Sequence, residues 1–149
     1  MPTSLQGRAK KAESQKGYRF RNRYGMLDED FLKQCWRDIR KDAASGVDQV
    51  SAQKDEQHLE ENIHHLVERL KQKRYRAKLV RRHYIPKGDG TQRPLGIPAV
   101  EDQLLQRAVA RLLEAIDEQD VLRWSYGYRP KVGALDAVDT LTITLQCGR

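Results

Sequence analysis

Long apolar runs and cysteines are both scarce in this 149-residue chain. No apolar run is long enough to span a bilayer, so the sequence predicts no membrane-spanning helix. The N-terminus carries cations without an apolar stretch behind them, so we expect no secretory signal. The two cysteines, Cys35 and Cys147, are far apart and lack the spacing of metal ligands. This favours free thiols in a reducing compartment, the cytoplasm, over a disulfide.

Carboxylates are nearly absent from two parts of the chain, although the sequence holds 21 of them against 28 Lys and Arg. Residues 1–25 hold seven cations and one carboxylate, a net charge of +6. Residues 26–69 hold six cations and eleven carboxylates, a net charge of −5. Residues 70–93 hold nine cations and one carboxylate, a net charge of +8. The remaining residues hold six cations and eight carboxylates, a net charge of −2. Such confinement of positive charge indicates a polyanionic partner.

The first 24 residues are polar and show no apolar periodicity, so we expect a basic, flexible N-terminal segment. Near its end three aromatic residues alternate with three arginines: Tyr18, Phe20 and Tyr24 with Arg19, Arg21 and Arg23. Rings of this kind stack on bases while guanidinium groups hold phosphates. The segment is therefore a candidate for nucleic-acid binding, and a solvated tail is the alternative.

Apolar spacing predicts three helices before residue 120. Asp28 is a suitable N-cap for a helix that ends near Lys41 and carries Trp36 on its core face. A second helix is expected from Gln53 to Lys71, and a third, with a wide apolar face, from Val100 to Ile116.

Three shorter features of the sequence are read as structural. Gly46-Val47-Asp48 predicts a turn, with Asp48 as a turn residue. The histidines are interpreted as solvated, because the adjacent pair points apart on a helix: His58, His64 and His65. Residues 134–146 give mixed signals, since Thr140 to Leu145 alternates like a strand, and we expect a helix there.

A hairpin that presents cations is predicted between the second and third helices. Lys78 to Ile85 contains β-branched and aromatic residues, Gly88-Asp89-Gly90 signals a reversal, and Gln92 to Ile97 alternates. The reversal brings Lys87 and Arg93 close together. Two such cations suit a triphosphate or a nucleic-acid backbone, and ordinary surface charge is the alternative.

Seven cations and no carboxylate occur from position 71 to position 82: Lys71, Lys73, Arg74, Arg76, Lys78, Arg81 and Arg82. The helix dipole favours cations near a helix C-terminus, which accounts for some of this charge. We expect the rest to bind nucleic acid. Arg129, predicted to be exposed on a turn before Pro130, is a further candidate.

Two ordered motifs resemble the group II intron reverse transcriptases. Ile85-Pro86-Lys87, then Arg93-Pro94-Leu95-Gly96-Ile97-Pro98, then Asp102-Gln103-Leu104-Leu105-Gln106 resemble the first fingers block of that family. Ser125-Tyr126-Gly127-Tyr128-Arg129-Pro130 resembles the start of its next block. The resemblance implies an α+β fold with helices packed around a small antiparallel hairpin, the fingers of a right-hand polymerase. Residues 25–149 would form this region, with the palm incomplete.

The resemblance also implies roles for individual residues. Lys87 and Arg93 would clamp the triphosphate of an incoming dNTP, Arg81 would lie beside them, and Arg129 would lie near template or intron RNA. Neither metal-binding motif of the palm is found here, so Mg²⁺ is implied for the full-length enzyme only. The chain is expected to bind RNA but not to polymerise alone, with palm and thumb as partners. The alternatives are a stand-alone, maturase-like RNA-binding protein that assists splicing, and a decayed fragment.

Overall fold

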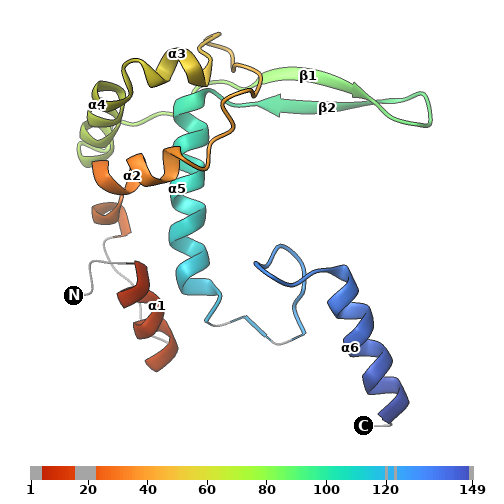
Figure 1. Ribbon diagram of the computed structural model, residues 1–149. Coiled ribbons are helices and arrows are strands. Elements are labelled where there is room, and N and C mark those ends of the chain that lie inside the picture. The colour runs from red at the N-terminus through yellow and green to blue at the C-terminus, as the bar shows by residue number, and fades with distance from the viewer. Residues whose placement is uncertain (1–4, 16–22, 120, 123, 148–149) are drawn as a thin grey trace. The chain divides into compact units, whose positions relative to one another are not determined.

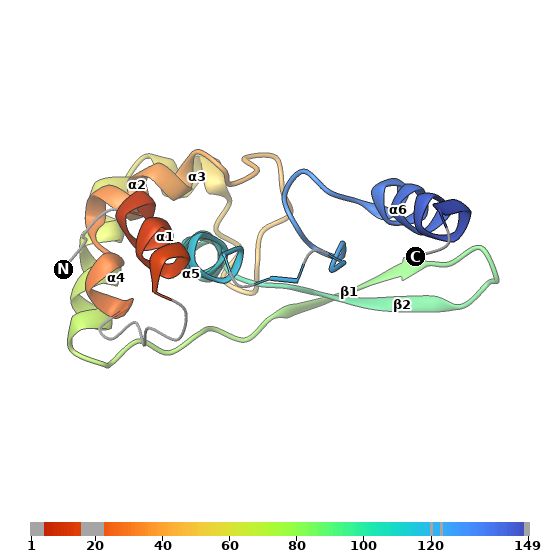
Figure 2. The ribbon, with the colours of Figure 1, turned by 90° about the horizontal axis from the view of Figure 1, so that it is seen from below.

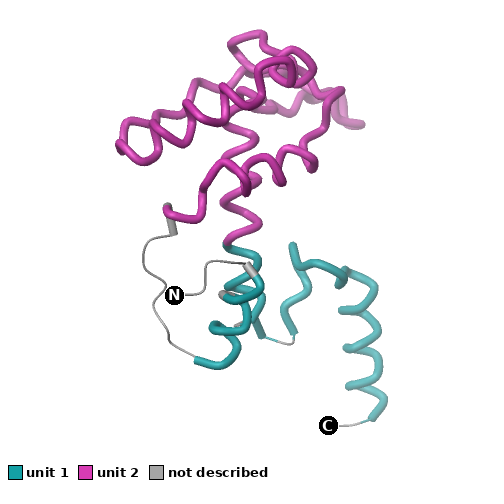
Figure 3. The backbone as a smooth tube through the Cα atoms, turned by 60° about the vertical axis from the view of Figure 1, so that its left-hand side comes forward, with its two compact units in different colours: residues 1–19, 113–149 teal, residues 20–112 magenta. Residues whose placement is uncertain are grey.

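The chain divides into two compact units in the computed structural model, which describes residues 5–15, 23–119, 121–122 and 124–147 (Figure 1). One unit, here called the hairpin unit, comprises residues 20–112, and the other comprises residues 1–19 and 113–149 (Figure 3). The described part contains helices and one two-stranded antiparallel sheet, which confirms the predicted α+β class. None of the helices within these ranges combines the length and apolar character needed to cross a bilayer.

The hairpin unit is a small helical cluster from which a β-hairpin extends. Its elements are η1 (Arg23–Met26), α2 (Glu29–Trp36), α3 (Ala52–Glu56), α4 (Leu59–Lys71), β1 (Arg81–Pro86), β2 (Gln92–Ile97) and the first part of α5 (Val100–Asp117). The core consists of apolar side chains on α2, α4 and α5, among them Leu32, Ile63, Leu66, Val67 and Leu104. Burial of this apolar area is the main stabilising term of the unit.

The first predicted helix begins where expected and ends early. The Asp28 carboxylate accepts a hydrogen bond from the Phe31 amide at 2.9 Å, so the predicted N-cap is confirmed. Trp36 is buried, as predicted, but it is the last residue of α2. Beyond it the amides of Asp38 and Ile39 bond to carbonyls three residues back, the tighter pattern in which helices often end.

The predicted single helix from Gln53 to Lys71 is wrong at its centre. The structure has two helices, because α3 ends at Glu56 and α4 begins at Leu59. The His58 amide bonds to the Asp55 carbonyl, again three residues back. In contrast, α5 matches the predicted helix within one residue.

Among the described residues, no helix of the hairpin unit covers the hairpin, which corrects the expectation that helices pack around it. β1 and β2 run side by side away from α2 and α4 (Figure 2), and their residues are exposed apart from the half-buried Ile97. One face carries Arg81, His83 and Arg93, and the other carries Arg82, Gln92 and both prolines, so neither offers a continuous apolar surface for a helix. The cluster of helices, rather than the sheet, therefore forms the core of this unit.

The second unit contains α1 (Leu5–Ser14) and α6 (Ala134–Cys147). α1 lies in the segment that lacks apolar periodicity and was expected to be flexible, and its Ala12 is buried. The predicted helix near residue 134 is confirmed. None of its described side chains is buried, and the hydroxyls of Thr140, Thr142 and Thr144 donate to carbonyls four residues back. These bonds let β-branched threonines remain in a helix.

Candidate nucleic-acid interface

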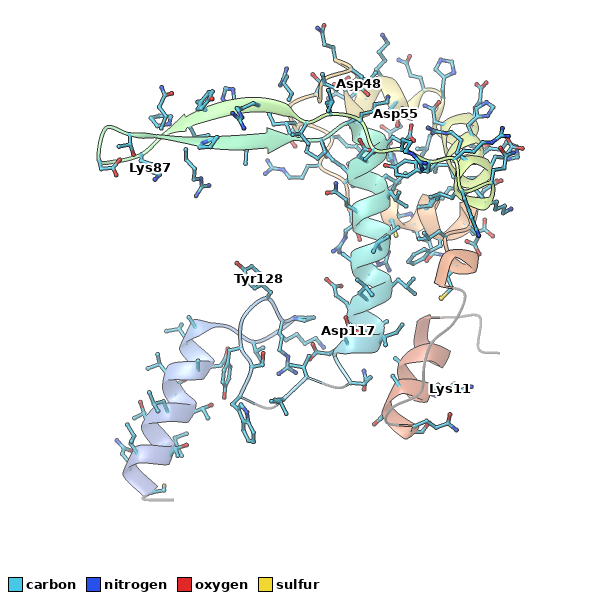
Figure 4. All side chains as sticks on the ribbon, turned by 180° about the vertical axis from the view of Figure 1, so that it is seen from behind. Lys11, Asp48, Asp55, Lys87, Asp117 and Tyr128 are labelled. Carbon is cyan, nitrogen blue, oxygen red and sulfur yellow. The ribbon has the colours of Figure 1, made fainter. Side chains whose placement is uncertain are left out.

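The hairpin turn is a three-residue loop closed by backbone hydrogen bonds. The Lys87 amide donates to the Thr91 carbonyl at 2.7 Å, and the Gly90 amide donates to the Lys87 carbonyl at 3.2 Å. Gly90 has φ of +80°, as expected for the residue that follows a type I turn in such loops. Asp89 accepts bonds from the Thr91 amide at 3.0 Å and hydroxyl at 2.6 Å. These contacts confirm the predicted reversal and place Lys87 at the tip (Figure 4).

The register of the strands decides which hairpin cations lie together. Ile85 pairs with Arg93 and Arg81 pairs with Ile97, so Arg81 and Arg93 lie on the same face of the ribbon. The Lys87–Thr91 bond adds one step to this ladder, which makes Lys87 and Arg93 diagonal neighbours, roughly 7 Å apart between backbones. Arg81 lies four residues before Ile85, roughly 13 Å along the strand. Lys87 and Arg93 therefore form a pair, and Arg81 stands apart from it.

The segment that enters the hairpin is anchored by Asp102, in the first turn of α5. Asp102 is 3% exposed, and its two carboxylate oxygens accept bonds from the Tyr75 hydroxyl and, at 3.0 Å, from the Lys78 amide. Burial and the neighbouring carboxylate raise the pKa of Tyr75 above its usual value. Next to this site, Arg69 forms an ion pair with Glu101. The chain between α4 and β1 is thus tied to the start of α5.

The segment that leaves the hairpin is held by Gly46 and Gln103. A Cβ on Gly46 would lie 2.6 Å from the Ala99 Cα and 2.8 Å from the Pro98 carbonyl oxygen, so glycine is needed for this approach. The Gln103 side chain donates to the same carbonyl at 2.9 Å. Both ends of the hairpin are therefore fixed to one helix terminus.

Asp48 connects the segment that enters the hairpin, through Lys78, with the turn that follows Gly46. Its carboxylate accepts a bond from the Val50 amide at 3.3 Å, which confirms the predicted turn role, and forms an ion pair with the Lys78 ammonium at 2.9 Å. Burial opposes ionisation of Asp48, but the bonds from Lys78 and Val50 outweigh it and lower its pKa. Lys78, predicted to bind nucleic acid, thus already has a carboxylate partner in the folded chain.

A cavity of about 400 Å³ lies beside this junction, and its wall is formed by Asp48, Val50, Lys78 and residues of α3, α4 and α5. Three of its carboxylates already have partners: Asp48 bonds to Lys78, Glu101 to Arg69, and Asp55 accepts from Asn62 at 2.7 Å. Burial raises the pKa of Asp55. Within the described residues, no set of three or more His, Cys, Asp or Glu side chains is arranged to hold a metal ion. We assign the cavity a structural role.

Most cations predicted to bind nucleic acid are exposed. We define the basic stretch as the eight exposed cations Lys71, Lys73, Arg74, Arg76, Arg81, Arg82, Lys87 and Arg93. None of them forms an ion pair with a carboxylate among the residues that the structure describes. Arg19 and Arg21 lie outside the described residues, and of Arg23 only the backbone is described. The basic stretch is the candidate interface.

Arg129 is not the exposed turn residue that the sequence predicts. Its side chain is 19% exposed and forms an ion pair with Glu118. The same guanidinium donates to the carbonyls of Leu122 at 3.3 Å and Ser125 at 2.9 Å. The hydrogen bond between Arg129 and Glu118 raises the pKa of Arg129 and lowers that of Glu118. Arg129 closes its own loop, so we leave it out of the candidate interface.

Sequence reasoning missed the anchoring roles of Asp102 and Tyr75. The sequence offered little signal, because Asp102 lies between the polar residues Glu101 and Gln103, and acidic residues are common in the first turn of a helix. A carboxylate buried there must be hydrogen-bonded. Its partners come from residues 75 and 78, and no local pattern indicates them.

Comparison with known proteins gives partial matches. No protein-family model matches the chain. It is 38% identical over 104 residues to Protein YkfC of Escherichia coli, which is 69% of this chain and 27% of that protein. It is 40% identical over 83 residues to the Group II intron-encoded protein LtrA of Lactococcus lactis subsp. cremoris, 55% of this chain and 14% of LtrA. The chain thus spans less than a third of the curated relatives it matches, and it is related in sequence to a group II intron-encoded protein over part of its length.

Proposed function

We propose that this chain is the fingers region of a group II intron reverse transcriptase, and that its basic stretch binds intron or template RNA. The observation that carries the proposal is the basic stretch itself: eight exposed cations without a carboxylate partner among the described residues. A solvated surface normally mixes charges of both signs, whereas a nucleic-acid footprint concentrates one sign. The partial identity to a group II intron-encoded protein supports RNA as the polyanion.

Salt dependence of RNA binding tests this proposal. If six or more phosphates are contacted, affinity for structured RNA should fall by roughly 10³ between 50 and 200 mM salt. Replacing Arg74 and Arg82 with glutamine should weaken binding and reduce the slope by about two. The matched control replaces Lys33 and Arg40, which form ion pairs with Glu60 and Asp42. An affinity that does not depend on salt, or an equal effect of both double variants, would contradict the proposal.

A finer part of the proposal concerns the incoming nucleotide. Lys87 and Arg93 are diagonal neighbours at the hairpin tip, as a clamp on one small polyanion requires. Arg93 supplies a planar fork that matches phosphate oxygens, and Lys87 supplies a point charge. The metal ions of phosphoryl transfer would be held by palm carboxylates in the longer enzyme. Arg81, about 13 Å along the strand, would contact RNA rather than the same phosphates.

This finer part is tested in a longer protein that includes a palm. Arg93→Ala should raise the KM for dNTP and leave RNA affinity nearly unchanged, because the clamp acts on the nucleotide alone. Lys73→Ala should weaken RNA binding and spare the KM, because Lys73 belongs to the RNA footprint. If the two variants behave alike in both assays, the hairpin is one part of a general basic surface. The stand-alone, maturase-like RNA-binding protein would then be the better description.

A further inference from the structure

A second cavity lies at the C-terminal end of α4, away from the hairpin tip. Its volume is about 630 Å³, within the range of small-molecule sites. Leu27, Leu70 and Tyr75 contribute apolar surface to its wall, and the first two side chains are otherwise buried. The Tyr75 hydroxyl is bonded to Asp102, which fixes the position of its ring. The cavity thus offers an apolar wall with one aromatic ring held in place.

The exposed rim of this cavity is cationic. Lys71, Lys73 and Arg76 line it, and none of them is paired with a carboxylate among the described residues. The single carboxylate in the lining, Asp28, already accepts the capping bond from the Phe31 amide. A ligand that fits must therefore combine a flat or apolar body with negative charge.

Lys73 is placed at this rim by an unusual backbone conformation. Its φ is +56°, and the amides that follow it, Arg74 and Tyr75, bond back to the Arg69 carbonyl at 2.9 and 3.2 Å. This position after a helix C-terminus is normally taken by glycine, because a side chain is disfavoured at positive φ. A lysine at this position makes the protein less stable than a glycine would. This cost suggests that the charge of Lys73 has a functional role.

We propose that this cavity binds one unpaired nucleotide of an RNA strand. The base would lie against Leu27, Leu70 and Tyr75, and its flanking phosphates would contact Lys71, Lys73 and Arg76. Single-stranded and bulged RNA is recognised in this way, by an aromatic or apolar surface for the base and cations for the backbone. The inference rests on the proposed RNA-binding function and adds the kind of RNA feature that is selected.

The test compares two RNA stems that differ in one position, using the full chain at fixed salt. One stem carries a single bulged 2-aminopurine, and the other carries 2-aminopurine in a base pair. The bulged stem should bind about tenfold more tightly, which is within the contribution of stacking one base. Its fluorescence should also change on binding. Equal affinity of the two stems would overturn the cavity assignment and leave RNA binding intact, whereas failure of both stems to bind would contradict the proposed function itself.

The variant Lys73→Gly distinguishes a loss of binding at the cavity from a loss of stability of the fold. Glycine accepts φ of +56°, so this variant should be as stable as the parent or more stable, yet its preference for the bulged stem should fall to within about twofold. Lys131→Gly is the matched control, because exposed Lys131 also has positive φ, +67°, and lies in the other unit. It should keep the preference.

Two results would overturn the proposal at this stage. One is an equal loss of preference in Lys73→Gly and Lys131→Gly, which would indicate a general charge effect. The other concerns the source of the nucleotide. If free 2-aminopurine ribonucleoside monophosphate displaces the bulged stem at concentrations comparable to the RNA, the cavity is a mononucleotide site rather than a site for an RNA strand.

Discussion

Tyr75 donates its hydroxyl hydrogen bond to the buried carboxylate of Asp102, across 27 residues of sequence. The second oxygen of that carboxylate accepts the backbone amide of Lys78, three residues before β1 begins. The Asp102 side chain therefore fixes both Tyr75, which lines the second cavity, and the segment that leads into β1. Removal of either partner leaves a buried polar group without its bond.

Tyr75→Phe should lower the free energy of unfolding by about 1 kcal/mol, the net contribution of one hydrogen bond. Asp102→Ala should lower it by more, because two donors lose their acceptor. The double variant should show a coupling energy of roughly 0.5–3 kcal/mol, as expected for residues in contact. Urea denaturation followed by circular dichroism measures all three. Strict additivity of the two single changes would show that the bond is not formed.

Gly46→Ala should destabilise the hairpin unit, because the added Cβ would lie 2.6 Å from the Ala99 Cα. Overpacking against backbone costs typically 1–3 kcal/mol. Gly88→Ala is the matched control: nothing lies within 4 Å of its Cβ position, so we expect a change within about 0.5 kcal/mol. The measurement is the midpoint of urea denaturation, and similar midpoints for the two variants would contradict the close approach.

Because of the Asp48–Lys78 ion pair, the free energy of unfolding should depend on pH in the acid range. Burial opposes ionisation of Asp48, but Lys78 lowers its pKa overall, so the pair's contribution is present above the usual aspartate pKa of about 4. This contribution is lost as pH falls through the lowered pKa of the folded state. Because the Lys78 side chain is 45% exposed, we expect at most about 1 kcal/mol.

Lys78→Met should therefore lower the free energy of unfolding at pH 7. It should also make that free energy fall less steeply below pH 4, because the Asp48 carboxylate then lacks its ammonium partner. The control is Arg40→Met, which removes the partner of Asp42 in a pair whose side chains are both more than 70% exposed. That control should change little at any pH. Chemical denaturation at pH 7, 4 and 3 provides the comparison, and a parallel shift of Lys78→Met at every pH would contradict the linkage.

Arg129→Ala should destabilise its loop and leave RNA affinity nearly unaffected. Its guanidinium is bonded to Glu118, Leu122 and Ser125, so its removal leaves three acceptors of the loop without their donor. Lys131→Ala, which removes an exposed cation nearby in sequence, sets the scale for a general charge effect on RNA binding. A loss of RNA affinity in Arg129→Ala well beyond that of Lys131→Ala would restore the role predicted from sequence.

Local patterns were sufficient for several parts of the fold. The N-cap at Asp28, the reversal at Gly88-Asp89-Gly90 and the helix over α5 were all predicted correctly, because each depends on residues a few positions apart. The residues of the proposed triphosphate clamp, Lys87 and Arg93, could also be named from the turn between them. Their action on a nucleotide stays a prediction.

Tertiary structure decided which cations are free and which are used within the protein. From the sequence, Lys78 and Arg129 look like members of the same basic population as Lys73 and Arg82. Their partners, Asp48 and Glu118, lie 30 and 11 residues away, and no local spacing indicates these pairings. The same holds for Gly46 and Asp102, whose neighbours are set by the return of the chain at the base of the hairpin. Charge is a property of the residue, whereas its availability depends on burial and on partners that only the folded chain brings within bonding distance.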